Sequence, residues 1–362
     1  MNTSISKLSE EIKTELTEKS TRTVVDIFIY WIGLGKPISI WLGIIITFLL
    51  TIVISLIIVF ISGEFPNLYQ IGLALPISLM SLTTFTLFMC TVSMMFANTF
   101  LHRVVDVLRD QVVDLAESPR TLIEIRSWVK LICDKSLIIL AVALFGGVAS
   151  ATYAMTILNN ITGIPFRFGL LLPFILFSTQ STVFVGAGLA ILVLAMYMWN
   201  FELRLFESDP AGSEVITNLS GLFSNYVYLV AIYGAILTFG IVRTGLAAYY
   251  TLLIFVFWTP IIAIFVVSQL SLARIIQHSK WKTLNSIQKK VSALQKEKIL
   301  PNNADRESIK WLLDYHERVK LTRNSALNLS SWFNFLNSLL LPLIAFILGN
   351  IDTLLKLFSG RP

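Results

Sequence analysis

Seven stretches of this chain are apolar over about the twenty residues that a helix needs to cross the roughly 30 Å hydrocarbon core of a bilayer. They are Ile38–Ile61, Ile71–Ala97, Ser136–Leu158, Thr182–Phe201, Tyr226–Val242, Tyr249–Leu270 and Phe333–Leu348. Only 14% of the residues are charged, well below the share of about a quarter in soluble proteins. Lipid cannot hydrogen-bond to a backbone, so such stretches form helices. The sequence therefore predicts an all-α, polytopic transmembrane protein with about seven spans.

The basic residues indicate how these spans are oriented. Of 28 Lys and Arg residues, 24 lie in four segments on one side of the predicted spans, which hold 5, 6, 1 and 12 of them; the other side holds 0, 1, 1 and 2. Lys and Arg are retained on the cytoplasmic side. Four tryptophans lie at the predicted cytoplasmic ends of the spans, as in an interfacial aromatic belt. They are Trp41, Trp128, Trp199 and Trp332. We expect a plasma (inner) membrane protein with a cytoplasmic N-terminus and an outside C-terminus.

One apolar segment does not have the length of a span. Residues 163–180 contain Arg167 and Pro173, and the longest uninterrupted apolar run is short. A short run of this kind is typical of a re-entrant or interfacial helix. We therefore expect a short outer-leaflet helix that does not cross, which keeps the largest charged segment in the cytoplasm.

Two cytoplasmic segments have the pattern of antiparallel helical hairpins. Residues 273–330 carry apolar residues at helical spacing on both sides of a turn at Pro301, over 273–300 and 304–329. Residues 99–135 contain a shorter pair separated by Ser118-Pro119, with Thr121 and Glu124 at capping-box spacing. The N-terminal stripe Ile5, Leu8, Ile12 and Leu16 is expected to pack beside the shorter hairpin.

These features predict a domain order. It runs 1–36, a cytoplasmic amphipathic segment; 37–98, spans 1 and 2; 99–135, the first hairpin; 136–201, spans 3 and 4 with the short helix 163–180; 202–225, a short acidic loop; 226–272, spans 5 and 6; 273–330, the basic hairpin; and 331–362, span 7 and the C-terminal tail.

The basic hairpin holds the charge excess of the chain, with twelve bases, five acids and a net charge of +7. Its bases nearest the membrane are candidates for binding anionic lipid or a partner, since each is attracted by about 1 kcal/mol to an anionic leaflet. They are Arg274, Lys280, Lys282, Arg318, Lys320 and Arg323. The loop 202–225 has a net charge of −3, and its Asp209-Pro210 pair predicts the start of a short helix on which the hairpin could dock.

Catalytic and cofactor motifs are missing from the sequence. It contains no GxSxG, HExxH, Walker A, GxGxxG or CxxC pattern, and its three histidines are scattered. The interiors of the predicted spans carry no ionisable residue of the kind that ion-coupled transporters need. We therefore expect no enzyme, no cofactor and no metal site, and the few aromatic residues among the bases argue against nucleic-acid binding.

Polar residues within the spans are hydroxyls and small side chains. Thr83, Thr86, Cys90 and Ser93 lie on one face of the second span, which is either a wet lining or a packing seam. Gln180 and Thr182 precede a Gly-x-Gly pair in a pattern that resembles the filter of potassium channels in part, although the order of glycine and aromatic residues differs. These six residues are the candidate pore-lining set.

Three functions remain open at this point. The first is a channel- or pore-like protein, oligomeric and gated by its cytoplasmic hairpins. The second is a membrane-anchored scaffold or signalling protein whose basic hairpin binds a cytoplasmic partner or anionic lipid, and a transporter of an uncharged solute is a third. A water-filled space beside the hydroxyl face would favour the first; burial of that face against neighbouring helices would favour the second.

Overall fold

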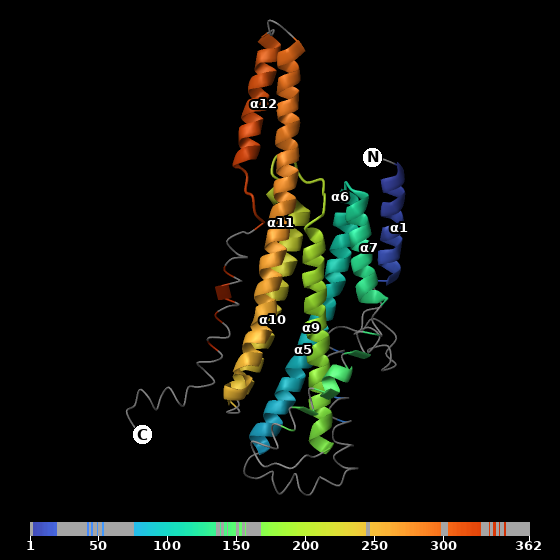
Figure 1. Ribbon diagram of the computed structural model, residues 1–362, viewed down its shortest axis with the longest axis vertical. Coiled ribbons are helices and arrows are strands. Elements are labelled where there is room, and N and C mark those ends of the chain that lie inside the picture. Colours follow the sequence, from blue (N-terminus) through green and yellow to red (C-terminus); the bar gives the residue numbers. More distant parts are fainter. Residues whose placement is uncertain are drawn as a thin grey trace, which may run out of the picture.

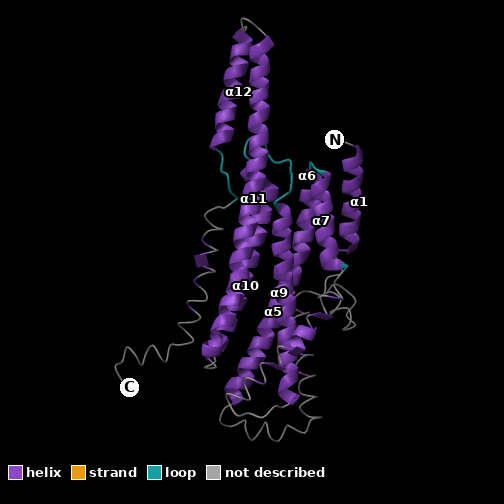
Figure 2. Ribbon diagram, viewed as in Figure 1, coloured by secondary structure: helices purple, strands orange, loops and turns teal. Residues whose placement is uncertain are grey.

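The computed structural model describes residues 3–19, 76–134, 168–243, 247–297 and 303–326, with further single positions and short stretches between 42 and 53, 138 and 156, and 333 and 344. All named elements of this part are helical (Figures 1 and 2). They are α1 (Thr3–Lys19), α5 (Pro76–Val107), the π-helix η1 (Leu108–Val112), α6 (Val113–Leu115), α7 (Pro119–Cys133), α9 (Phe168–Met198), the 3-10 turn η2 (Pro210–Gly212), α10 (Glu214–Arg243), α11 (Ala247–Glu297) and α12 (Asn303–Leu321). The all-α prediction is confirmed for the described part of the chain.

Four long helices form the core. Helix α5 packs against α9 and α10, and α11 packs against the same two helices, so the four make a closed ring. Aromatic side chains fill its centre: the rings of Phe184 and Tyr233 lie 4.6 Å apart, and those of Phe100 and Tyr226 lie 4.8 Å apart. Rings at these distances gain favourable energy beyond that of their buried area.

Three helices of the described part are long and apolar enough to cross a membrane, at Ser178–Met198, Glu214–Ile236 and Ile261–Gln295. This is fewer than the seven predicted spans. The predicted spans Ile38–Ile61, Ser136–Leu158 and Phe333–Leu348 lie largely outside the described residues. Helix α5 covers most of the predicted span Ile71–Ala97, but most side chains there are not described.

Large apolar side chains point outward along these helices. Val185 and Leu189 on α9 are exposed, as are Ile262, Val266 and Leu270 on α11 at a spacing of four. A soluble protein rarely exposes continuous apolar stripes of this kind. They fit insertion of the helices into lipid.

The expectation of a separate short helix at 163–180 was wrong. Residues from Phe168 to Met198 form one continuous helix of 31 residues. Pro173 lies near its start, where the loss of one backbone hydrogen bond leaves the following turns intact, and prolines are tolerated in membrane helices. The predicted fourth span is thus the second part of a longer helix.

Helix α11 is continuous from the predicted sixth span into the basic hairpin. Its 51 residues extend about 76 Å at 1.5 Å per residue. Figure 1 shows its second half and α12 standing side by side beyond the other elements. The apolar stripe of the hairpin is buried as predicted, at Leu284, Ile287 and Val291 on α11 and Val319 on α12.

Two helix boundaries differ from the sequence-based expectation. Helix α12 ends at Leu321 rather than near residue 329, and carbonyl groups at this end accept from a lysine of α11, as described below. Helix α10 begins at Glu214, so the second half of the predicted acidic loop is helical. Asp209-Pro210 starts only the three-residue turn η2, and the side chain of Asp209 makes no capping hydrogen bond.

The first hairpin turns at Ser118, but its cap is not the predicted one. The Ser118 side chain accepts from the backbone N–H of Arg120 and Pro119 is the first residue of α7, an arrangement that favours a helix start. Thr121 is fully buried instead, and its hydroxyl accepts from the N–H of Glu202. Trp128 is also buried rather than interfacial, and its indole donates to the carbonyl of Ala190 at 2.7 Å.

Candidate functional site

The base of the basic hairpin is fixed by one lysine. The Lys280 ammonium group, on α11, donates to the carbonyls of Lys320 and Thr322 and to Asn324 Oδ1 at 2.8, 2.7 and 2.8 Å. The residue is only 6% exposed. A cation that binds the final carbonyls of a helix satisfies groups with no intrahelical partner and complements the helix dipole. Lys280 therefore closes the hairpin.

Burial lowers the pKa of Lys280, and the nearby carboxylate of Asp209 opposes that shift. Burial raises the pKa of Tyr315 on α12, and Glu207 raises it further. Two acids of the predicted acidic loop thus lie close enough to the base of the hairpin to act on it electrostatically. Among the described residues, neither Glu207 nor Asp209 forms an ion pair with the hairpin. The predicted docking of the loop on the hairpin is therefore supported only by the closeness of these two acids to the base of the hairpin.

The same loop is attached to the first hairpin. The N–H of Glu117 donates to the carbonyl of Glu202 at 2.9 Å, and the N–H of Arg204 donates to the carbonyl of Leu115 at 2.8 Å. Ala116 and Leu203 form an antiparallel bridge between these bonds. The loop thus lies between the two hairpins and contacts both.

Two other bases of α11 also have partners. The guanidinium of Arg274 lies 4.6 Å from the centre of the Trp199 ring, a distance at which a cation is attracted to the ring face. Lys282 forms an ion pair with Glu117 in the turn of the first hairpin. Both side chains of this pair are partly exposed, so it contributes about 0–1 kcal/mol.

The remaining predicted binding residues lie on the surface. Arg318, Lys320 and Arg323 are exposed. Four large apolar side chains of the same hairpin are exposed as well, and they are Trp281, Trp311, Leu313 and Leu321. The Trp311 ring stacks on Tyr315 with centres 5.5 Å apart. The hairpin therefore presents aromatic and apolar groups together with positive charge.

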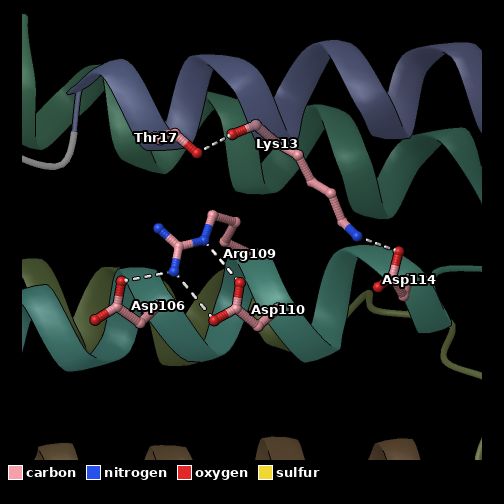
Figure 3. Close-up of polar contacts among 6 residues, drawn as sticks. All are labelled: Lys13, Thr17, Asp106, Arg109, Asp110 and Asp114. Carbon is pink, nitrogen blue, oxygen red and sulfur yellow. Dashed lines mark hydrogen bonds and ion pairs between the residues drawn. The ribbon is translucent and has the colours of Figure 1, made fainter.

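Helix α1 packs against the first hairpin as predicted. Ile12 and Leu16 are buried in the core there, and Ile5 and Leu8 are partly buried against it. Lys13 forms an ion pair with Asp114 at 2.6 Å, shown in Figure 3. These contacts join the N-terminal segment to η1, α6 and α7.

Arginine side chains complete this attachment. Arg126 on α7 pairs with Glu11 and Glu15 of α1 at 3.3 and 2.6 Å. Arg109 makes its pairs within its own helix: at the junction of α5 and η1 it lies between Asp106 and Asp110 (Figure 3), and its hydrogen bonds to Asp110 lower the pKa of that carboxyl group. These acids are paired with bases, and no group of histidine, cysteine and acidic residues in the described part of the chain is arranged to hold a metal ion.

Inside the helix ring, the predicted pore-lining residues that are described lie in packed surroundings. Gln180 is 6% exposed, and its amide donates to Thr91 Oγ1 at 3.0 Å. Ser93 is buried as well. Thr182 is only half-buried and donates to the carbonyl of Ser178 in its own helix at 2.7 Å, so it does not bear on the contact between helices. The side chains of Thr83, Thr86 and Cys90 lie outside the described residues. These contacts favour a packing seam between α5 and α9.

Close packing also occurs at small residues. A Cβ atom on Gly147 would collide with Thr179 Oγ1 on α9 and lie 3.0 Å from its backbone nitrogen, whereas one on Gly146 would meet nothing within 4 Å. Gly188 faces the Tyr226 hydroxyl, 3.3 Å from where a Cβ would be. Small residues that let helices approach closely are the expected contact of membrane helices.

Sequence reasoning missed three contacts of this site. The roles of Lys280 and of the Lys282–Glu117 pair depend on residues 40 to 165 positions apart. Thr91 is one position off the predicted hydroxyl face and was not selected, although it is the partner of Gln180. Only for Lys280 did the sequence contain a signal that could have been used: this lysine stands at a position of the apolar stripe of α11, where an apolar residue is expected.

Comparisons with known proteins add no identification: no family model, no curated protein and no solved structure matches the chain.

Proposed function

We propose that this protein is a membrane-anchored scaffold or signalling protein whose basic hairpin binds an acidic protein partner in the cytoplasm. The observation that carries the proposal is the exposure of Trp281 and Trp311, at 62% and 64%, on the hairpin with a net charge of +7. Retention of Lys and Arg on the cytoplasmic side explains positive charge but not exposed tryptophan. Tryptophan and arginine are the residue types that most often dominate binding energy at protein interfaces.

The height of the hairpin favours a protein partner over the lipid surface. Lys280 is ten residues beyond Leu270, the end of the predicted span, and so about 15 Å beyond it along the helix. The headgroup layer on each side of a bilayer is about 5–8 Å thick, and salt screens charges over about 8 Å. Trp311 lies farther out, towards the tip of the hairpin. A soluble acidic surface can reach these groups more readily than the membrane from which the hairpin rises.

Burial inside the helix ring supports the same proposal. Thr91, Ser93 and Gln180 are buried among helices, and aromatic rings fill the centre of the four-helix ring. Such packing suits a membrane anchor.

Site-specific photo-crosslinking tests the proposal. A photoreactive residue replaces Trp311 in the full chain in its native membrane, and the matched control carries the same residue at Ile123, which is 55% exposed on α7. We expect a discrete protein adduct at Trp311 that disappears when Arg318, Lys320 and Arg323 are changed to Glu. Equal adduct patterns at the two positions would refute the proposal, and adducts with lipid alone would favour the lipid-binding alternative.

A channel-like protein gated by the hairpins is the second candidate. Its support is the continuity of α11, which would carry any motion of the hairpin directly into the membrane helix. Solute flux through reconstituted vesicles tests this candidate, and the expected signal is a flux that changes in Lys280→Met, whose hairpin base is loosened. Vesicles as tight as protein-free ones would exclude it.

A further inference from the structure

In the described part of the chain, three buried polar side chains of the helix ring have no hydrogen-bond partner. They are Ser220 and Ser224 on α10, at 3% and 5% exposed, and Gln269 on α11, at 6%. Both the oxygen and the nitrogen of the Gln269 amide are unpaired. Other buried polar groups of the same ring are paired: Gln180 bonds to Thr91, and Ser271 donates to the carbonyl of Ala195 at 2.6 Å.

These three residues lie at one level of the ring. Helices α10 and α11 are antiparallel neighbours, and only residues 244–246 separate Arg243 from Ala247. Ser220 is 23 residues before the end of α10, and Gln269 is 22 residues after the start of α11. At 1.5 Å per residue their heights differ by about 1.5 Å, and Ser224 differs from Gln269 by about 4.5 Å.

The two serines lie on the side of α10 that faces α11. The rings of Tyr226 and Tyr233 on α10 contact Phe184 on α9, so these two tyrosines mark the side of α10 that faces α9. At 100° per residue, Ser220 and Ser224 lie about 120–180° around the helix from these tyrosines. Asn218 of α10 donates to Gln111 of η1, which continues α5, and the two serines lie about 120–160° around the helix from Asn218 as well. They are nevertheless buried, so they face α11, the other long helix that packs against α10.

Gln269 correspondingly lies on the side of α11 that faces α10. Ile264 of α11 lies beside Gly188 on α9, and Ser271 bonds to α9 at Ala195. Gln269 is about 140–160° around the helix from these two positions, towards α10. The three unpaired groups therefore lie at the same helix–helix interface.

The chemistry of this cluster defines what can bind there. An amide offers donors and an acceptor, and a hydroxyl offers both. A metal cation cannot satisfy the N–H groups of the amide, and an anion cannot satisfy its oxygen. The serines can bond to carbonyls of their own helix, but the amide of Gln269 cannot be satisfied that way. A small neutral molecule that both donates and accepts meets all these requirements, and water is the smallest.

The cluster is close to one end of the apolar ring. Ser220 is six residues, or about 9 Å, from the start of α10 at Glu214, and the loop 201–213 precedes that start. Gln269 adjoins the last residues of the predicted span. Along α10, Ser220 thus lies between the hairpin end of the ring and the level of Tyr226 in the aromatic centre.

We propose that Ser220, Ser224 and Gln269 form a buried polar site that binds water or another small neutral hydroxyl- or amide-bearing molecule and is reached from the hairpin side. The site is independent of partner binding by the basic hairpin.

Cysteine accessibility tests this site. In a Cys90→Ala, Cys133→Ala background, Ser224→Cys and Ser220→Cys are treated with a small water-soluble methanethiosulfonate reagent from the hairpin side. The control is Ser271→Cys, which replaces a buried serine that has a partner. We expect labelling at least tenfold faster at both test positions than at the control. Equal rates at the three positions, or no labelling at any, would overturn the site.

A second measurement holds even if the cysteine variants fold poorly. Gln269→Leu removes the amide at similar volume. If the site is dry, loss of an unpaired buried amide stabilises the protein and raises Tm. If the amide binds water or a small solute, Tm falls, because an apolar group then faces the bound molecule. A raised Tm contradicts the proposal.

Discussion

The contact of Lys280 with the end of α12 gives the sharpest prediction. In Lys280→Met the aliphatic part of the side chain is kept and the ammonium group is lost. The change removes three hydrogen bonds, to the carbonyls of Lys320 and Thr322 and to Asn324. We expect α12 to open more easily, because its last carbonyls lose the cation that binds them.

The size of this effect follows from the environment of the acceptors. One hydrogen bond to a charged group contributes about 1.5–3 kcal/mol. Asn324 is exposed and Thr322 is partly exposed, so these acceptors regain water after the substitution. The net loss is therefore closer to one such bond than to three, about 2–3 kcal/mol. At 1.4 kcal/mol for each factor of ten, amide hydrogen exchange in α12 becomes about 30- to 150-fold faster.

Hydrogen exchange measured by mass spectrometry on the full chain in nanodiscs checks this value. The matched control is Lys282→Met, two residues away on α11, which removes only a partly exposed ion pair. Its expected effect is about 0–1 kcal/mol. If the two variants exchange at the same rate in α12, Lys280 does not hold the hairpin and the reasoning is refuted.

Three further predictions concern packing and charge. Gly147→Ala should destabilise the protein by about 1–3 kcal/mol through overpacking, while Gly146→Ala, which faces open space, should change Tm little. Arg126→Gln should release α1 and expose it to limited proteolysis; unchanged cleavage would contradict the ion-pair account. The hydrogen bond from Arg109 lowers the pKa of Asp110. The ionised carboxylate therefore stabilises the folded protein at pH values above its ordinary pKa of 3.8, and this stabilisation is lost as pH falls through the lowered pKa. Asp110→Asn should therefore lower Tm at pH 7, and its difference from the wild type should shrink as pH falls below 3.8; a difference that does not change with pH would argue against this pairing.

Much of the fold could be predicted from local patterns. The stripe of Leu284, Ile287 and Val291 indicated the outgoing arm of the basic hairpin, and Ser118-Pro119 indicated the start of α7. Both rest on interactions within a few residues, which a sequence displays directly. The expected separation of a short helix over 163–180 from the span that begins at Thr182 failed for the same reason, because Arg167 and Pro173 are local signals and the helix continues from Phe168 to Met198.

The candidate site could be predicted only in part. The sequence identified six bases near the membrane end of the hairpin as one group with one role. In the structure Lys280 closes the hairpin, Arg274 stacks on Trp199, and Lys282 bonds to the first hairpin, while the other three are exposed. These roles depend on partners far along the chain, which no spacing rule contains.

The sequence by itself determined that the chain is helical, that long parts of it are apolar enough for lipid, and that one amphipathic hairpin carries the excess charge. These properties follow from composition and from periodicity along a helix. Only the tertiary structure decided which polar groups are paired, buried without a partner or free to bind. Pairing requires atoms within about 3 Å of each other, and such distances are set by how four helices and two hairpins pack, at Lys280, Gln180 and Gln269 alike.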